Sequence, residues 1–383
     1  MFGSNVLGLI FTYTFGGEGI IGGSNMGALP FGAKYDVIDF SLSNMVNSGI
    51  KKVGVITDDN YGPLIEHIGS GEEWNLSHKR QGLFILPPYG LESNCDSGRI
   101  KSLDLAKGFI EKSHEEYVLL ADSETVCNID YKNLFAQHER TGADITLVCR
   151  FGKLPDDMHD PLIITVDSSM RVRDMGFSTS QGGKTCYSIG MMLIRRKLLL
   201  ELVADCISRN LCNFKSGLLI RNFSLLKTYA YVFCGFSKDI CSEKAYFKAN
   251  MSLLNTSSRM RLFGEGRPIY TRTCDYTPTR YSSGCKVANS LIGDGCLIEG
   301  EVENSLIFHG VHIDKGACVK NCIIMQDGRI KEGCNLNCAI AFNAGSGNSG
   351  FSNLSVRHFP ILSLPAVQEN RFAEQIKADS FAR

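Results

Sequence analysis

The chain has 383 residues, of which 44% are hydrophobic and 21% are charged, as in an ordinary globular protein long enough for two or three domains. Its 40 lysines and arginines equal its 40 aspartates and glutamates, so the formal net charge is zero. A neutral chain argues against a bulk polyanion, either nucleic acid or an acidic membrane surface, as its partner.

The location of the protein is predicted from the segments that secretion or a membrane would require. The first basic residue is Lys34, so the apolar start lacks the positive region of a secretory signal. No uncharged apolar run approaches the roughly 20 residues that span a bilayer. We therefore expect a cytoplasmic protein that does not contact a membrane.

The 15 cysteines could form disulfides, bind a metal or pack as small apolar side chains. There is no Cys-x-x-Cys pair, and the closest spacings are Cys318/Cys322 and Cys334/Cys338. An odd count in a chain without a signal favours reduced thiols that are buried as small apolar residues. We therefore favour this interpretation over a structural zinc site.

Short apolar runs alternate with helix-like segments up to about residue 250. Strands are expected at residues 6–11, 53–57, 117–121, 145–149 and 189–194. Helices are expected at residues 197–206 and 243–254, the second capped by Ser242. This alternation is typical of a mostly parallel sheet covered on both faces, which is the doubly wound α/β class.

The alternation is clearest in residues 30–54, which read PFGAKYDVIDFSLSNMVNSGIKKVG. Three apolar residues lie at positions i, i+3 and i+4 and predict one face of a short helix: Leu42, Met45 and Val46. We expect Ser41 to cap the start of this helix and Gly49 to supply the left-handed residue after its end. A buried strand is then expected at residues 50–57.

The pattern changes from about Gly284. Aliphatic residues recur every five or six positions, and glycines separate them at the expected corners. This spacing is that of hexapeptide repeats, in which each turn of a left-handed parallel β-helix stacks its apolar residues on the next turn. Six cysteines are expected to stack inside this coil: Cys285, Cys296, Cys318, Cys322, Cys334 and Cys338.

These patterns divide the chain into four parts. They are an α/β domain at 1–255, a linker at 256–283, the β-helix at 284–342, and a flexible segment with a tail at 343–383. The flexible segment opens with Asn-Ala-Gly-Ser-Gly-Asn-Ser-Gly. The tail after it either docks back on the coil or stays loose.

Five local motifs add a family resemblance to this pattern. They are PFGAKYDVIDFSLSN at 30–44, HIGSGEEWNL at 67–76, LPPYG at 86–90, NIDY at 128–131 and AYFKANMSLL at 245–254. With these motifs, the chain to about residue 340 resembles glucose-1-phosphate adenylyltransferase, also called ADP-glucose pyrophosphorylase. The resemblance implies a nucleotidyltransferase-like α/β domain before the β-helix. It also implies a role in making ADP-glucose and pyrophosphate from ATP and glucose 1-phosphate.

The resemblance further implies which cations the reaction needs, and several are replaced. The family has a Gly-Gly-x-Gly-x-Arg loop directly after the first strand, whereas the glycines at 16–19 come several residues late and no arginine follows them. A family lysine falls on Met26, a family arginine falls on Asp36, and the sugar-phosphate lysine falls within 177–179, which reads Phe-Ser-Thr. Each such contact is commonly worth on the order of 10²–10³ in rate, so we expect little turnover.

Carboxylates remain where the family binds metal. The first family aspartate falls on Glu124, with Asp122 two residues earlier, and either carboxylate could hold a metal. The second falls on Asp239. If any activity remains, the resemblance implies Mg²⁺ as the cofactor, held by Glu124 and Asp239; otherwise we expect no cofactor. We name no catalytic residue and regard Asp122, Glu124 and Asp239 as remnants.

Basic residues between the two domains are candidates for binding an anion. Residues 259–280 carry five arginines against Glu265 and Asp275. Lys34 falls on a family lysine that contributes to effector binding. We predict that a sugar phosphate or a similar anionic effector binds to Lys34, Arg259, Arg261 and Arg267. The alternative is that these arginines form a solvated linker surface.

Three functions remain open from the residues alone. The pattern is most similar to the regulatory, non-catalytic companion subunit of bacterial glycogen synthesis, and Gly98-Arg99-Ile100 fits that companion better than the catalytic subunit. The expected partner is then a catalytic glucose-1-phosphate adenylyltransferase subunit in a hetero-oligomer. The second function is a weakly active adenylyltransferase. The third is a hexapeptide acyltransferase, with His309 or His312 as the base, or a purely structural partner.

Overall fold

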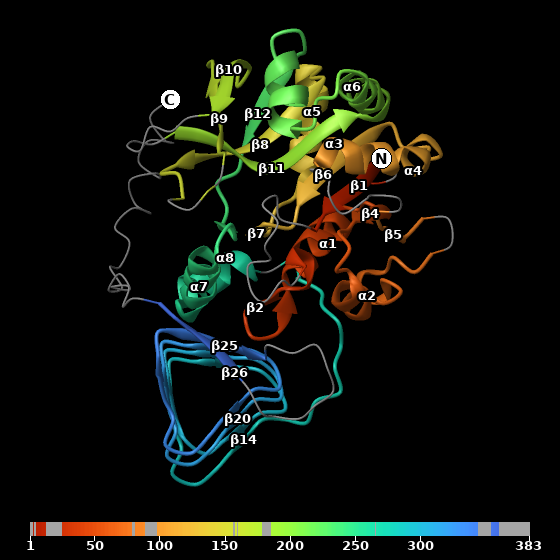
Figure 1. Ribbon diagram of the computed structural model, residues 1–383. Helices are drawn as coiled ribbons and strands as arrows, with labels where there is room; N and C mark the ends of the chain where they lie inside the picture. The colour runs from red at the N-terminus through yellow and green to blue at the C-terminus, as the bar shows by residue number, and fades with distance from the viewer. Residues whose placement is uncertain are drawn as a thin grey trace.

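The computed structural model describes residues 3, 5–12, 25–78, 81–88, 98–155, 158, 160–177, 185–264, 266–343 and 354–359. Figure 1 shows an α/β domain, in red to green, joined to a triangular coil of short strands in cyan and blue. The predicted fold class, an α/β domain followed by a parallel β-helix, is confirmed. Within the described residues, no helix has the length and apolar character that a bilayer crossing requires.

Nine described strands form the main sheet of the α/β domain. Seven follow in the order β10 (Val172–Phe177), β9 (Leu162–Val166), β11 (Thr185–Arg195), β6 (Tyr117–Asp122), β1 (Val6–Phe11), β4 (Lys52–Ile56) and β5 (Leu83–Leu86). The other two are β8 (Ile145–Gly152), which pairs with β11, and β12 (Thr228–Val232), which pairs with β8. Strands β6, β1, β4 and β5 are parallel, as predicted, whereas β11 is antiparallel to β6, β8 and β9. The prediction of a mostly parallel sheet therefore holds for one half only.

Helices cover both faces of this sheet. One face packs on α1 (Val37–Asn47), α2 (Gly62–Ile68) and α5 (Tyr131–Thr141). The other packs on α3 (Arg99–Leu105), α4 (Lys107–Glu111) and α6 (Arg196–Ser208). Alternate residues of β1 enter the two cores, Val6 and Ile10 on one side and Leu7 and Leu9 on the other, because successive side chains of a strand point to opposite faces.

The start of α1 corrects one prediction. Ser41 does not cap the helix; it lies inside α1 and is buried. The helix begins one turn earlier, with Asp36 as the N-cap, and the Asp39 carboxylate accepts a hydrogen bond from the Asp36 N–H at 2.9 Å. Gly49 follows the helix with φ 89°, as predicted.

Shorter elements complete the α/β domain. They are η1 (Met26–Ala28), β2 (Pro30–Phe31), β3 (Tyr35–Asp36), η2 (Glu72–Trp74), β7 (Thr125–Cys127), η3 (Phe214–Ile220), β13 (Ser237–Asp239), α7 (Glu243–Met251), η4 (Ser252–Leu254) and α8 (Thr256–Leu262). The Ser242 hydroxyl accepts a hydrogen bond from the Ala245 N–H at 3.0 Å, so the predicted cap of α7 is confirmed.

Three walls of parallel strands form the coil. The first wall contains β14 (Arg280–Tyr281), β17 (Leu297–Ile298), β20 (His312–Ile313) and β23 (Arg329–Ile330). The second contains β15 (Lys286–Ala288), β18 (Glu301–Glu303), β21 (Cys318–Lys320) and β24 (Asn335–Asn337). The third contains β16 (Leu291–Ile292), β19 (Leu306–Ile307), β22 (Ile323–Ile324) and β25 (Ala339–Asn343). Of the six cysteines expected inside, Cys296, Cys322 and Cys338 are buried, but Cys334 is exposed.

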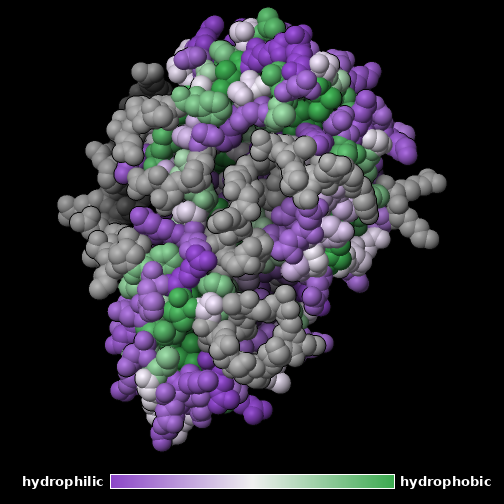
Figure 2. All heavy atoms as spheres, viewed as in Figure 1, coloured by the Kyte–Doolittle hydropathy of each residue, from purple (hydrophilic) through white to green (hydrophobic). Residues whose placement is uncertain are grey.

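The two domains share an apolar core. Phe31 and Phe247 of the α/β domain belong to the same buried cluster as Phe308 and Met325 of the coil. In Figure 2, hydrophobic side chains gather on the coil just below α7. The described part of the tail contacts both domains: β26 (Leu354–His358) pairs with β25 of the coil, and Phe359 stacks on Phe247 of α7 with ring centroids 4.9 Å apart.

Candidate functional site

The three carboxylates retained in the sequence meet beyond the carboxyl end of β6. Asp122 is the last residue of that strand, beside Phe11 of β1, and Glu124 follows in the turn to β7. Asp239 ends β13, which pairs with β7, and its Oδ1 accepts a hydrogen bond from Thr125 Oγ1 at 2.8 Å. The pairing of β7 with β13 thus brings Asp239 to the other two carboxylates.

A buried arginine occupies this site. Arg99, the first residue of α3, forms an ion pair through Nη2 with Oδ2 of Asp122. The side chains of Arg99 and Asp122 are only 11% and 7% exposed. The guanidinium carbon lies 5.2 Å from the ring centroid of Phe11 and 5.7 Å from that of Phe214. Carboxylate and aromatic rings together hold the guanidinium in place.

Close packing explains how α3 reaches this position. Gly98 precedes Arg99, and a Cβ at Gly98 would collide with the carbonyl oxygen of Cys212. The absence of a side chain therefore lets the start of α3 approach the segment that leads into η3, which carries Phe214. Sequence reasoning recorded the Gly98-Arg99-Ile100 segment but assigned it no role in the site.

The electrostatics of Glu124 reflect its crowded position. Burial, together with the negative charges of Asp122 and Asp239, raises the pKa of Glu124 to about 7. The positive charges of Arg99 and Lys215 act in the opposite direction. Burial and the Arg99 charge lower the pKa of Lys215, whose Nζ donates a hydrogen bond to the Asp160 carbonyl at 2.8 Å.

Asp239 has its own set of positive neighbours. Burial raises its pKa, and the hydrogen bond from Thr125 and the charges of Arg150 and Lys238 oppose this effect. Arg150 is fixed by hydrogen bonds from Nη1 to the carbonyl oxygen and the hydroxyl of Ser237, at 2.8 and 2.6 Å. Side chains of the protein thus already provide positive charge to the carboxylates of this site.

The side chains around Asp122 do not fit a bound Mg²⁺. This ion needs a near-octahedral shell of oxygen ligands at about 2.0–2.1 Å, whereas Oδ2 of Asp122 contacts a guanidinium. In the part of the chain that the structure describes, no three His, Cys, Asp or Glu side chains are arranged to hold a metal ion. The predicted use of Glu124 and Asp239 as metal ligands stays a prediction.

The structure describes some of the residues that stand where the family has basic residues or its glycine-rich loop. Met26 is 3% exposed and packs in the core shared by the two domains. Phe177 ends β10 and is exposed. The glycines at 16–19 and residues 178–179 lie outside the described residues.

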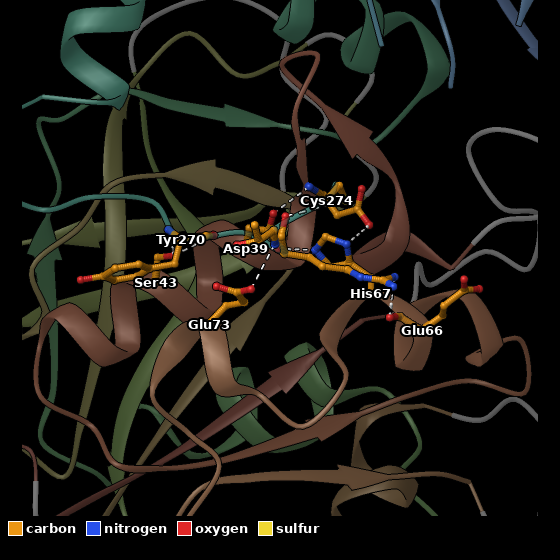
Figure 3. A network of polar contacts seen from close by, with 10 residues as sticks. Asp39, Ser43, Glu66, His67, Glu73, Tyr270 and Cys274 are labelled. Atoms are coloured by element: carbon orange, nitrogen blue, oxygen red, sulfur yellow. Dashed lines mark hydrogen bonds and ion pairs between the residues drawn. The ribbon is translucent and has the colours of Figure 1, made fainter. Parts of the chain in front are cut away.

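The residue that replaces a family arginine, Asp36, belongs to a network that sequence reasoning missed. Figure 3 shows His67 of α2 turned toward the start of α1. Its Nδ1 lies 3.1 Å from Oδ2 of Asp36, and its Nε2 lies 2.6 Å from Oδ1 of Asp39. His67 is the first residue of the HIGSGEEWNL motif, so the sequence could have singled it out as a candidate. Its partners in α1 cannot be predicted from the motif, because the fold brings them to His67.

Proton binding in this network is shifted in the folded state. Burial raises the pKa of Asp36 to about 7; the charges of His67 and Arg272 oppose this shift and that of Asp39 adds to it. Burial acts to lower the pKa of His67, but the hydrogen bond with Asp39 and the charges of Asp36 and Asp39 raise it overall. The pKa values of Asp36 and His67 are therefore both raised in the folded state.

The segment that leads to the coil lies against this network (Figure 3). Arg272 donates a hydrogen bond from Nη1 to the Glu66 carbonyl at 2.9 Å, and the Thr273 N–H donates to Glu73 at 3.1 Å. Tyr270 donates its N–H to the Ser43 hydroxyl at 2.9 Å. The charged network is thus directly connected to the junction between the domains.

The four residues predicted to bind an effector lie around α8. Lys34 is exposed in the turn between β2 and β3, next to Tyr35, whose ring stacks on Phe263 at the end of α8. Two arginines of the helix bind carbonyl oxygens: Arg259 those of Leu253 and Leu254, and Arg261 that of Cys234. The carbonyl oxygen of Arg267 accepts a hydrogen bond from Asn128.

The two coil histidines considered for acyl transfer have different surroundings. His309 packs against Tyr276, with ring centroids 4.6 Å apart and the rings tilted by 35°, and burial lowers its pKa. His312 lies in β20 and lines a pocket together with Arg280, and His309 is not among the residues that line it. The two imidazoles therefore do not form one site.

Comparisons with known proteins agree with this architecture. Residues 25–173 match a family model described as nucleotidyl transferase, and residues 276–343 match one described as GlmU-like, C-terminal hexapeptide. The chain is 32% identical over 323 residues to the glycogen biosynthesis protein GlgD of Bacillus subtilis (strain 168), covering 84% of each chain. It is 33% identical over 321 residues to GlgD of Geobacillus stearothermophilus, covering 82% of this chain and 83% of that protein. It is also 31% identical over 312 residues to the glucose-1-phosphate adenylyltransferase of Clostridium perfringens (strain 13 / Type A), covering 79% of this chain and 78% of that enzyme.

Proposed function

The chain belongs to the family of glucose-1-phosphate adenylyltransferases and GlgD proteins, and we propose that it is a regulatory subunit with little activity of its own. Its partner would be a catalytic glucose-1-phosphate adenylyltransferase in a cytoplasmic hetero-oligomer. The reaction that it modifies would be the synthesis of ADP-glucose from ATP and glucose 1-phosphate. The overall identity does not decide between regulation and catalysis, because it is 31–33% to both kinds of relative.

The observation that supports the proposal most directly is the loss of basic residues at family positions, together with the arginine that occupies the carboxylate site. Met26 and Asp36 stand where the family has basic residues, while Arg99 is bound to the carboxylate at the end of β6. A nucleotidyl transfer needs cations that face the phosphates and metal ions that neutralise them. Here Arg99 is buried against protein side chains instead.

The proposal is tested by pyrophosphate release from ATP and glucose 1-phosphate. The chain would be assayed alone, the catalytic relative alone, and the two after co-expression, with an unrelated protein added in place of this chain as the control. We expect the chain alone to be at least ~100-fold slower than its partner, given the loss of several transition-state contacts. We expect the mixture to differ from the partner in rate or effector response.

Two outcomes would contradict the proposal in different ways. Robust Mg²⁺-dependent turnover by the chain alone would identify it as an adenylyltransferase in its own right, which is the alternative that Asp122, Glu124 and Asp239 keep open. No activity alone, together with no effect on the partner's rate or effector response, would favour a purely structural partner or the coil-based acyltransferase.

An effector site formed by Lys34, Arg259, Arg261 and Arg267 is part of the proposal. The placement of the Lys34 turn beside α8 supports it, because binding there would act close to the domain junction. We expect Lys34→Gln to weaken the response of the co-assembled enzyme to a sugar bisphosphate. The exposed Lys132→Gln on α5 is the control, and an equal response in both variants would remove Lys34 from the site.

The domain limits at residues 255, 283 and 342 remain proposals as well. Limited proteolysis of the full chain would test them. Cleavage concentrated in 256–283 and after 342 is expected, whereas early cleavage inside 1–255 or 284–342 would contradict the division.

A further inference from the structure

We propose that Arg99 takes the place of a divalent cation at Asp122, so that this carboxylate is neutralised by the protein itself and binds no metal. The inference deepens the proposed function and rests on it, because a site closed in this way explains why a nucleotidyltransferase scaffold would not turn over. The property in question is metal binding by this chain, which can be measured without any enzymatic reaction.

The ion pair between Arg99 and Asp122 is enclosed by neighbouring side chains. Oδ2 of Asp122 faces Nη2 of Arg99, and both side chains are almost fully buried. The guanidinium cannot easily swing away, because its carbon lies within 6 Å of the ring centroids of both Phe11 and Phe214. An exposed arginine would exchange freely between water and a carboxylate, whereas this one is enclosed.

The backbone of β11 also crowds this carboxylate. Gly190 of β11 lies so near that a Cβ at this position would overlap Oδ2 of Asp122. Its φ of 77° also belongs to the region that favours glycine. The backbone at Gly190 and the guanidinium of Arg99 both crowd Oδ2 and reduce the space for the water molecules that Mg²⁺ normally retains.

The positive charges near Asp122 also oppose the binding of a divalent cation. Burial raises the pKa of Asp122 and of Glu124, and the positive charges of Arg99 and Lys215 oppose this shift at both carboxyls. A divalent cation added at Asp122 would lie beside Arg99, and like charges at such distances repel strongly in a buried site. Binding of metal would therefore require Arg99 to leave, and the buried carboxylate and the two rings hold it.

Binding of Mn²⁺, followed by the electron paramagnetic resonance signal of the free ion, tests the inference on the full-length chain. The variants are wild type, Arg99→Gln, Arg99→Ala, Asp122→Asn and the double variant Arg99→Ala/Asp122→Asn. Arg173→Ala is the matched control, because Arg173 pairs with Asp167 on the surface, where it is 62% exposed. Circular dichroism and thermal unfolding verify that each variant is folded.

We expect wild type and Asp122→Asn to bind Mn²⁺ equally weakly. Arg99→Gln or Arg99→Ala is expected to bind at least ~10-fold more tightly, about 1.4 kcal/mol, and the double variant is expected to lose this gain. Arg173→Ala should behave as wild type. If the Arg99 variants do not fold, the comparison of wild type with Asp122→Asn still decides: tighter binding by wild type would overturn the inference. Folded Arg99 variants with no gain would overturn it too.

The outcome is separable from that of the proposed function. An inactive chain that binds Mn²⁺ through Asp122 would overturn this inference and leave the regulatory role standing. Conversely, a chain that turns over alone, but whose Arg99 variants gain a metal site as described, would overturn the regulatory role and leave the inference standing.

Discussion

The Nε2 atom of His67 lies 2.6 Å from Oδ1 of Asp39, a carboxylate that is fully buried at the start of α1. The same ring reaches Asp36 through Nδ1, so one imidazole bridges the N-cap and the third residue of the helix. The position that holds a basic residue in the family therefore holds part of a structural ion-pair network here. This network links α1, α2 and the segment that leads to the coil.

Replacement of His67 is expected to destabilise the protein. His67→Ala leaves the buried Asp39 without its cation, and breaking a buried pair in this way typically costs about 3–5 kcal/mol. The free energy of unfolding in urea measures the change. His114→Ala, at an exposed histidine, is the control and should change it by less than about 0.5 kcal/mol. Equal effects of the two variants would show that the bridge contributes nothing.

The contribution of His67 should also depend on pH. Its pKa is raised in the folded state, so its stabilising effect is fully present below its ordinary pKa of 6.5 and is lost as the pH rises through the folded value. The difference between wild type and His67→Ala should therefore be larger at pH 6 than at pH 9, and a difference that grows with pH would contradict this assignment.

Glu124→Gln is expected to stabilise the protein at high pH. The pKa of Glu124 rises from 4.5 to about 7 on folding, so its ionised form disfavours the folded state progressively from pH 4.5 and fully above 7. We expect a gain of about 1–3 kcal/mol at pH 8 and little change at pH 4.5. Unfolding by urea at the two pH values measures it, with the exposed Glu139→Gln as the control. A gain of equal size at both pH values would exclude the titration of Glu124 as its cause.

Asn44 ties α1 to the strand that carries the site. Its Nδ2 donates to the Cys127 carbonyl at 2.9 Å, and its Oδ1 accepts from the Ile129 N–H at 3.1 Å. Asn44→Ala leaves both backbone groups buried without this partner, and each such group typically costs about 1–3 kcal/mol. We expect a loss of about 3 kcal/mol in the free energy of unfolding. Asn47→Ala, which removes one exposed hydrogen bond to Pro268, is the control and should cost less than half as much.

The shared core predicts that the domains are energetically coupled. Phe308 lies in the coil, is 1% exposed and packs in the cluster that includes Phe31 and Phe247 of the α/β domain. Phe308→Ala should lower the free energy of unfolding by about 3–5 kcal/mol, the usual range for a buried phenylalanine, as measured by unfolding in urea. Val287→Ala, at a half-exposed position of the same coil, should cost about 0.5 kcal/mol. A cost below about 1 kcal/mol for Phe308→Ala would mean that the domains fold independently.

Both architectures are predictable from the residues alone, because each is encoded by a local period. The i, i+3, i+4 spacing of Leu42, Met45 and Val46 predicts α1, and the five- or six-residue spacing after Gly284 predicts the coil. The predicted N-cap of α1, Ser41, is nevertheless wrong, although Ser and Asp are both favourable at this position. The helix begins after Asp36 because the apolar residues of its first turn pack into the cores on both sides of α1.

The contents of the site, in contrast, depend on how elements distant in the chain pack together. Asp122, Glu124 and Asp239 were evident as residue types, but the cation beside them was not, because Arg99 reaches Asp122 through the packing of α3 against η3 and β1. The pattern of apolar residues also does not predict the antiparallel direction of β11, which brings Gly190 against Asp122. Periodicity records which face of an element is buried, whereas the contacts between charged side chains depend on how distant elements pack against one another.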